Sequence, residues 1–179
     1  MMIFMDFFEI VKERHSVRSF KEGKEVPDEV VLELLELAIR APSAGNAQSW
    51  EFIIVKDQNK KNKLAEAALN QDFIACGSHL IIACANQELS SKIYGNRGWD
   101  LYSICETSAA IMILLLAAAN VNLGACWVGA FKDSEVREIL NIPKGVKPIA
   151  LIPIGYPKDI VKKGPARKDL KEKLHYGEY

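Results

Sequence analysis

The sequence predicts a single domain of the α+β class. Its 179 residues are 49% hydrophobic and 26% charged, a length and composition that suit one domain with a sizeable core. The predicted helices and strands follow one another without the strict strand–helix–strand alternation of a doubly wound sheet. We therefore expect one domain over residues 1–179, ending in a tail over about 158–179 that is too weakly apolar to pack alone.

The first third of the chain carries the signals of two helices. Asp6, with Glu9 three residues later, fits a capping box at the start of a first helix. Pro27 and the two acidic residues after it suit the start of a second helix. The apolar positions of this second helix recur at helical spacing: Val30, Val31, Leu34, Leu35 and Ala38. Pro42 disfavours helix at the residue before it, so the second helix should end there.

Two strands and a surface helix are predicted in the middle of the chain. Trp50–Val55 is short and rich in β-branched and aromatic residues, and His79–Ala85 has the continuous apolar character of a buried strand. Asn59–Leu69, rich in lysine and alanine, is predicted to be a surface helix. The polar segment Asn86–Asp100 contains two glycines and is predicted to be a surface loop.

A long apolar helix is predicted from about Leu101 to Asn120, closed by Asn122 and Gly124. Its stretch Ala109–Ala119 is wholly apolar but shorter than the roughly 18 residues that argue for a membrane span. We expect a helix buried on all sides, and a partner subunit would supply part of that cover.

The last third is predicted to contain two strands with a short helix between them. Cys126–Phe131 and Ile149–Ile154 have strand composition, and Pro153 marks the second as an edge strand or a bulged one. The helix is expected to be capped by Asp133 or Ser134.

Charge and cysteine content narrow the functional classes. With 23 basic and 23 acidic residues the net charge is zero, which argues against a general nucleic-acid binder. The four cysteines lie far apart in apolar surroundings, so we expect buried, reduced thiols in a cytoplasmic protein. The N-terminus lacks a basic leader and is better explained as an amphipathic helix than as a signal peptide. The sequence lacks the common nucleotide, zinc and hydrolase motifs, so a bound cofactor is expected to supply the reactivity.

Two segments in the first third could carry binding chemistry. Arg14–Arg18 would bring two guanidinium groups and a serine hydroxyl together on one face of a helix, a set that can hold a phosphate dianion. Ala41–Trp50 combines small residues, which let a flat ligand approach the backbone, with the hydrogen-bonding side chains of Ser43, Asn46 and Gln48.

Two further candidates lie later in the chain. In Gly124–Phe131, Gly129 indicates close passage of a strand beside another group, and Trp127 offers an aromatic wall. Arg167 stands in the basic tail. Taken one at a time, Arg14–Arg18 is better explained as a solvated helix face, Gly124–Phe131 as a core strand and Arg167 as solvated tail charge. For Ala41–Trp50, a turn and a binding loop fit the sequence equally well.

Together, and in this order, the segments resemble the FMN-dependent nitroreductase family. The family pattern R-x-S-x-R-x-F is similar to RHSVRSF, and A-P-S-x-x-N-x-Q-P-W-x-F is similar to APSAGNAQSWEF. The later family segments resemble NLGACWVGAF, NIPKGVKPIALIPIGYP and GPARKDLKEKLHYGEY. The resemblance spans almost the whole chain and implies an α+β fold with a central, mainly antiparallel sheet flanked by helices. It also implies an intertwined homodimer with two FMN sites at the interface, each built from both chains.

The resemblance implies roles for residues near both ends of the chain. Arg14 and Ser16 would bind the FMN phosphate, with Arg167 adding a charge, and His15 in the same motif would contribute mainly its backbone. Arg18 would lie near the N1–O2 edge of the flavin, where a fixed positive charge stabilises the reduced form.

It also implies contacts to the flavin ring. Pro42, Ser43 and Asn46 would reach the flavin of the partner subunit, and Gln48 would approach the ring from its own chain. The backbone of Val128–Gly129 would face N5. No side chain is expected to act as a nucleophile, and no metal is expected.

The implied activity is that of an oxidoreductase. NADH or NADPH would reduce FMN and leave, and an electrophilic small molecule such as a nitroaromatic or quinone would then accept the electrons in a ping-pong cycle. The alternatives are a non-catalytic FMN-binding module that senses redox state and an interaction protein with a degenerate pocket.

The chain departs from the family pattern at several points. Ser49 replaces the proline before Trp50, Asn122 stands where glycine is common, and Cys105–Glu106 replaces a more usual Gln-Asp pair. Larger members carry insertions near residues 86–100 that cover the flavin and select the substrate.

Overall fold

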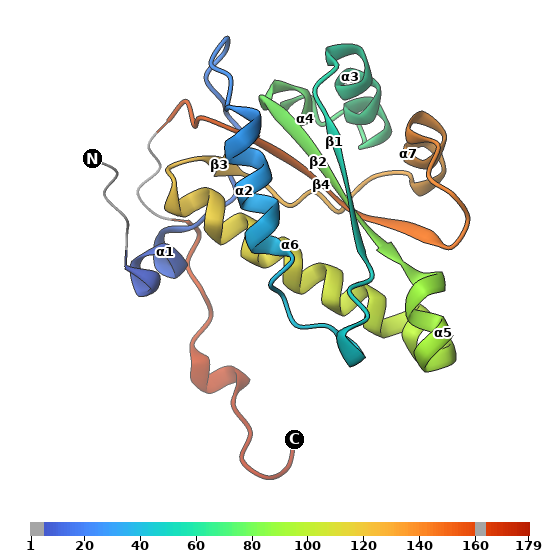
Figure 1. Ribbon diagram of the computed structural model, residues 1–179. Coiled ribbons are helices and arrows are strands. Elements are labelled where there is room, and N and C mark those ends of the chain that lie inside the picture. The colour runs from blue at the N-terminus through green and yellow to red at the C-terminus, as the bar shows by residue number, and fades with distance from the viewer. Residues whose placement is uncertain (1–5, 160–163) are drawn as a thin grey trace.

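The computed structural model describes residues 6–159 and 164–179 and has an antiparallel sheet at its centre (Figure 1). The strands lie in the order β1-β2-β4-β3, and every neighbouring pair is antiparallel. Their bounds are Trp50–Val55 for β1, His79–Asn86 for β2, Gly124–Ala125 for β3 and Val146–Gly155 for β4. The predicted α+β class, with a mainly antiparallel sheet between helices, is confirmed.

The sheet is buried on both faces because its central strands are apolar on both sides. In β2, Ile81 and Ala83 belong to one hydrophobic core, whereas Leu80 and Ile82 belong to the other. Successive strand residues point to opposite faces, so a strand covered on both faces must be continuously apolar. The buried strand expected over His79–Ala85 is confirmed on this ground.

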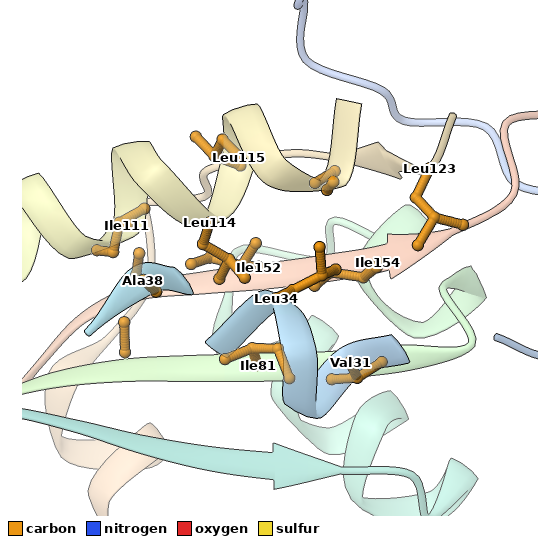
Figure 2. Close-up of a cluster of buried hydrophobic side chains, with 14 of the residues drawn as sticks. Val31, Leu34, Ala38, Ile81, Ile111, Leu114, Leu115, Leu123, Ile152 and Ile154 are labelled. Atoms are coloured by element: carbon orange, nitrogen blue, oxygen red, sulfur yellow. The ribbon is translucent and has the colours of Figure 1, made fainter. Parts of the chain in front are cut away.

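Helices cover the two faces of the sheet. On one face lie α2 and α6, with bounds Asp28–Ala38 and Ser103–Asn120. On the other lie α3, α4 and α7, with bounds Gln58–Ala67, Phe73–Cys76 and Asp133–Leu140. Figure 2 shows the first core, where Leu34 of α2 and Leu114 of α6 meet Ile152 of β4. All three side chains are at most 2% exposed.

The N-terminal helices begin as predicted. Helix α1 (Phe7–Glu13) has a capping box in which the Asp6 carboxylate accepts the N–H of Phe8 at 3.1 Å. In return, the Glu9 carboxylate accepts the N–H of Asp6 at 3.3 Å. Helix α2 begins directly after Pro27.

The segment Asn86–Asp100, predicted to be a surface loop, is helical. Helix α5 (Gln87–Arg97) begins at Asn86, whose side-chain oxygen accepts the N–H of Leu89 at 2.9 Å. A π-helical turn over Gly98–Tyr102 then leads into α6. The prediction was wrong because the segment is polar without a helical apolar period, and because Gly95 interrupts the helix with φ of 55°.

Helix α6 is covered in part by its own chain, and the remaining cover that was expected from a partner subunit stays a prediction. The helical segment Gln87–Asn120 is long and apolar enough to cross a membrane by length and composition, but core helices of globular proteins also meet this criterion, and half of its most apolar window is buried in the fold. The sheet-facing residues of α6 are covered, whereas Leu101, just before it, is 40% exposed and Met112 38% exposed. An apolar stripe of this helix therefore lies outside the core of its own chain.

The prediction of a strand over Cys126–Phe131 is wrong. Only Val128 pairs there, exchanging backbone hydrogen bonds with Leu151 at 2.9 and 3.0 Å, and β3 ends at Ala125. Of the two alternatives for this strand, the edge is wrong, because β4 lies between β2 and β3, whereas an irregularity is present: the pairing of β4 with β2 shifts register between Ala83 and Cys84. Pro153 directs its missing N–H to the same side as the N–H of Leu151, opposite the unpaired stretch between Ala125 and Val128.

Of the remaining predictions about the fold, some are confirmed and others are wrong. Asn122 follows α6 with φ of 60°, as expected of a residue in the left-handed region. Helix α7 is present, but Lys132 precedes it and no side chain caps it. Cys84 and Cys126 are buried as predicted, whereas the remaining two cysteines, Cys76 and Cys105, are exposed.

Candidate functional site

The segment Arg14–Arg18 is extended rather than helical, which changes how its side chains come together. The backbone N–H of Val17 donates to Ala125 at 3.0 Å, and Val17 packs against Gly124. Arg14, Ser16 and Arg18 all lie near the Cys126 thiol, because each of them lowers its pKa, so the three side chains gather on one side of the segment. The predicted cluster is thus formed without the helix that was expected.

The Cys126 thiol lies beside this cluster, and the charges of the cluster affect its pKa. Burial raises the pKa of Cys126, while Arg18, a hydrogen bond from Ser16, and Arg14 act in the opposite direction. None of the ion pairs found in the described ranges involves either arginine. Both guanidinium charges therefore remain available to an anion.

His15 has one ring nitrogen bonded within the fold and one without a partner. Its Nδ1 lies 3.0 Å from the carbonyl oxygen of Glu13, whereas its Nε2 is buried and has no partner within the described residues. Because Nδ1 donates its proton to that carbonyl, Nε2 of the neutral ring is an acceptor, and it donates to an anion only when the ring is protonated. A phosphate group fits the donors gathered here, because it accepts several charge-assisted hydrogen bonds at once.

The start of the C-terminal tail lies against the same segment. Gly164 is so close to His15 that a Cβ added there would stand 3.2 Å from the Cβ of His15. Arg167 is exposed and donates to the carbonyl oxygen of Pro165 at 3.2 Å. Residues 160–163 of the predicted tail lie outside the described residues. Beyond Arg167 the chain extends away from the sheet and its helices (Figure 1).

The Val128–Gly129 backbone offers one N–H rather than two. The N–H of Val128 donates to Leu151, so it is occupied within the fold. Gly129 is exposed, and its N–H takes part in no backbone hydrogen bond found in the described part of the chain. An added Cβ at Gly129 would be 3.7 Å from the indole nitrogen of Trp127, which places the predicted aromatic wall beside it.

The remaining candidates lie in one loop at the other end of α6. Asn46 and Gln48 have φ of 58° and 50°, and Ser43 Oγ accepts the N–H of Gln48 at 3.1 Å. A hollow of about 260 Å³ adjoins this loop. Its lining residues are Pro42, Ser43, Ala44, Tyr102, Cys105, Glu106 and Ala109.

One chain does not bring the two groups of candidates together. The loop lies near the start of α6, whereas α1 and β3 lie at its end (Figure 1). Between Glu106 and Asn120 the helix advances about 21 Å, at roughly 1.5 Å per residue. Gln48 lies with Asn46 in the loop and not with the Arg14–Arg18 segment.

Sequence reasoning noted Glu106 but did not predict what it contacts. Its carboxylate is 4% exposed and accepts hydrogen bonds from Ala44 and Ser49 of the loop. The sequence did offer one indication of this contact, because Glu106 is a lone acidic residue near the start of an otherwise apolar helix. Tyr94 of α5, which packs over Gly45, fell in the segment predicted to be a loop.

A separate polar cluster joins α2 to β2. His79 Nε2 lies 2.9 Å from Asp28 Oδ1, and Lys56 donates to the same oxygen at 2.6 Å. The Ser78 hydroxyl lies 2.9 Å from His79 Nδ1 and accepts the N–H of Val26 at 2.9 Å. Hydrogen bonds from Lys56 and His79 hold the pKa of Asp28 below its ordinary value. Both ring nitrogens of His79 are thus engaged inside the fold, so the cluster is structural.

Comparison with known proteins finds similar sequences over most of the chain. A model described as the nitroreductase family matches residues 11–75 and 68–156. A putative NADH dehydrogenase/NAD(P)H nitroreductase of Archaeoglobus fulgidus is 34% identical over 150 residues, covering 82% of this chain and 82% of the relative. An FMN reductase (NADPH) of Bacillus subtilis is 26% identical, covering 88% of this chain and 68% of the relative.

Solved structures of proteins with similar names have the same fold as this chain. The crystal structure of a putative NADH dehydrogenase/NAD(P)H nitroreductase from Parabacteroides distasonis has a TM-score of 0.85 and 27% identity to this chain. The similarity covers 97% of this chain and 98% of that one.

Proposed function

Because the chain belongs to the nitroreductase family, we propose that it is an NAD(P)H-dependent flavin oxidoreductase with FMN as its cofactor. NADH or NADPH serves as electron donor. A small electrophilic molecule, such as a nitroaromatic or a quinone, serves as acceptor. The names of similar proteins support the reaction class, since they include an NAD(P)H nitroreductase and an FMN reductase (NADPH).

The observation that carries the choice of FMN is the donor cluster at the Arg14–Arg18 segment. Arg14, Ser16 and Arg18 share one side of an extended chain, and the unpartnered His15 Nε2 lies in the same segment. In this proposal, Arg14, His15 and Ser16 hold the phosphate, and Arg167 adds charge from the tail. Two guanidinium groups and a hydroxyl suit a phosphate dianion because each supplies hydrogen bonds to its oxygens.

Hydride transfer at the flavin ring needs few protein groups. Bound FMN accepts and donates hydride equivalents at N5. Arg18 places positive charge near the N1–O2 edge, where negative charge develops on reduction. The N–H of Gly129 would donate to the flavin, and the Val128 N–H, held by Leu151, fixes the backbone there. No side chain acts as a nucleophile.

The complete site requires two copies of the chain. Pro42, Ser43 and Asn46 lie at the opposite end of α6 from the phosphate cluster, so those of a second copy complete the site. Gln48 belongs to the same loop, and its approach to the flavin of its own chain stays a prediction. The exposed stripe of α6 gives the second copy an apolar surface to cover.

The tail extends the proposed interface. We assign residues 1–179 to one domain whose tail, about 158–179, wraps the partner subunit. The tail has apolar side chains that its own chain leaves exposed, among them Leu170 at 67% and Tyr176 at 91%. We place this homodimer in the cytoplasm, with no nucleic acid, membrane or metal as partner.

The test is the absorption spectrum of the purified protein under anaerobic titration with NADH and then NADPH. The proposal expects a flavin spectrum that bleaches, a dimeric mass in solution, and repeated turnover with menadione or a nitroarene. Tight FMN binding without turnover would instead support the redox-sensing module. Absence of both FMN and bleaching would refute the proposal, and a flavin-loaded monomer would refute the two-chain site.

A further inference from the structure

The Glu106 carboxylate is buried against the loop that carries Pro42, Ser43 and Asn46. Its residue is 4% exposed, and none of the ion pairs within residues 6–159 and 164–179 gives it a cationic partner. A buried carboxylate needs several hydrogen-bond donors to compensate for lost water. All the donors that the structure gives it come from the loop.

Those donors lie at both ends of the loop. One carboxylate oxygen, Oε2, accepts the N–H of Ala44 at 3.1 Å. The other, Oε1, accepts the N–H of Ser49 at 3.2 Å and also the Ser49 hydroxyl. Ser49 itself is fully buried. One side chain of α6 therefore joins the beginning of the loop to its end.

We propose that Glu106 and Ser49 are positioning residues that hold the flavin-facing loop in its binding conformation before FMN arrives. This inference rests on the proposed function. The loop needs such a constraint because Asn46 and Gln48 have positive φ, which is unfavourable for residues with a Cβ. With the loop held, less of the FMN binding energy is used to order it.

A second contact holds the loop from another side. Gly45, at φ of 54°, lies directly beneath the hydroxyl of Tyr94 from α5. Tyr94 is fixed in turn by an edge-to-face contact with Tyr102, with ring centroids 5.1 Å apart. The turn at Gly45 is thus packed against α5 while its flanks are bonded to α6.

The two residues that form the clamp are both departures from the family pattern. A proline at position 49 would have neither the N–H nor the hydroxyl that Ser49 donates to Glu106. An aspartate at position 106 would be one methylene shorter and would draw the carboxylate back from both Ala44 and Ser49. The two replacements meet in one contact.

The test compares Glu106→Gln and Ser49→Ala with wild type, using Glu36→Gln as the matched control. Glutamine keeps the shape of Glu106 but has one oxygen, so it leaves at least one loop N–H without an acceptor. Glu36 of α2 is exposed, and no hydrogen bond or ion pair found among the described residues involves its side chain, so its substitution removes the same charge without touching the clamp. Amide hydrogen exchange at Ala44 and Ser49 is measured on FMN-free protein, and the FMN dissociation constant by flavin fluorescence.

We expect Glu106→Gln to speed exchange at both amides, and to weaken FMN binding, by about tenfold each, the usual consequence of one unsatisfied buried donor. Ser49→Ala, which removes only the hydroxyl, should act in the same direction to a smaller extent. Combined, the two substitutions should cost less than the sum of their separate effects, because both break one contact. Exchange in β2 and β4 should stay unchanged.

Unchanged exchange at Ala44 and Ser49 in Glu106→Gln would overturn the proposal. So would an equal acceleration in β2 and β4, because Glu106 would then support the fold as a whole. Additive effects of the two substitutions on FMN binding would also count against it. If wild type binds no FMN, the proposed function fails, whereas exchange at the two amides still decides whether the clamp exists.

Discussion

Substitution of Gly45 by alanine tests the described geometry of the loop. Gly45 has φ of 54°, a left-handed conformation that costs an L-residue about 1 to 2 kcal/mol. A Cβ at this position would also collide with the hydroxyl oxygen of Tyr94. The ring would have to leave its contact with Tyr102, which is worth about 1 kcal/mol. We therefore expect Gly45→Ala to lower the free energy of unfolding by about 2 to 3 kcal/mol.

A second glycine provides the matched control. Gly23 has φ of 66°, and an added Cβ there would meet nothing within 4 Å. Gly23→Ala should therefore show the backbone cost alone, about 1 to 2 kcal/mol. The measurement is urea unfolding of FMN-free protein followed by tryptophan fluorescence, with linear extrapolation to water.

The collision can be relieved without restoring the glycine. In Gly45→Ala combined with Tyr94→Phe the hydroxyl is gone, and the atoms that then face the added Cβ are ring carbons at 3.3 and 3.5 Å. About 1 kcal/mol should be recovered relative to Gly45→Ala alone. Equal costs for Gly45→Ala and Gly23→Ala, with no recovery from Tyr94→Phe, would refute the described packing of α5 over the loop.

Three further predictions concern charge and titration. Arg18→Ala should slow anaerobic flavin reduction, followed by stopped-flow absorbance, more than Arg167→Ala does, and the reverse order would contradict the place given to Arg18. At pH 8, Cys84 and Cys126 should react with a thiol reagent only after unfolding, because burial raises both pKa values, that of Cys84 to about 12; fast reaction of more than two thiols in native protein would disagree. Asp28→Asn should destabilise the protein at neutral pH, since hydrogen bonds from its lysine and histidine partners lower the folded-state pKa of Asp28 below the ordinary 3.8. That stabilisation is present above pH 3.8 and is lost as pH falls through the folded-state pKa, so urea unfolding should show the variant and wild type converging in acid.

Local patterns were enough to predict most of the fold. The capping box at Asp6, the helix start after Pro27 and the continuous apolar run of β2 each depend on neighbours in sequence, and each is confirmed. Helix α5 was missed because its residues are polar and Gly95 interrupts it, so its stability comes from packing that the sequence does not display.

The site was less accessible to sequence reasoning than the fold. The Arg14–Arg18 segment has the predicted composition, but its conformation depends on pairing with Ala125, more than 100 residues away. The contact between Glu106 and Ser49 likewise joins two distant positions, each noticed only as a departure from a pattern. A pattern predicts which residue types are present, whereas their contacts depend on the tertiary fold.

The order of the strands in the sheet also affects how the chain folds during its synthesis. During synthesis α6 emerges before β4, although β4 is one of the strands that α6 covers, and β4 pairs with β2 across residues as distant as His79 and Ile154. Until Val146–Gly155 has left the ribosome, a helix apolar enough to cross a membrane lacks one of the strands against which it packs. Such non-local pairing is slow to form, so the nascent chain passes through a stage that chaperones are suited to protect.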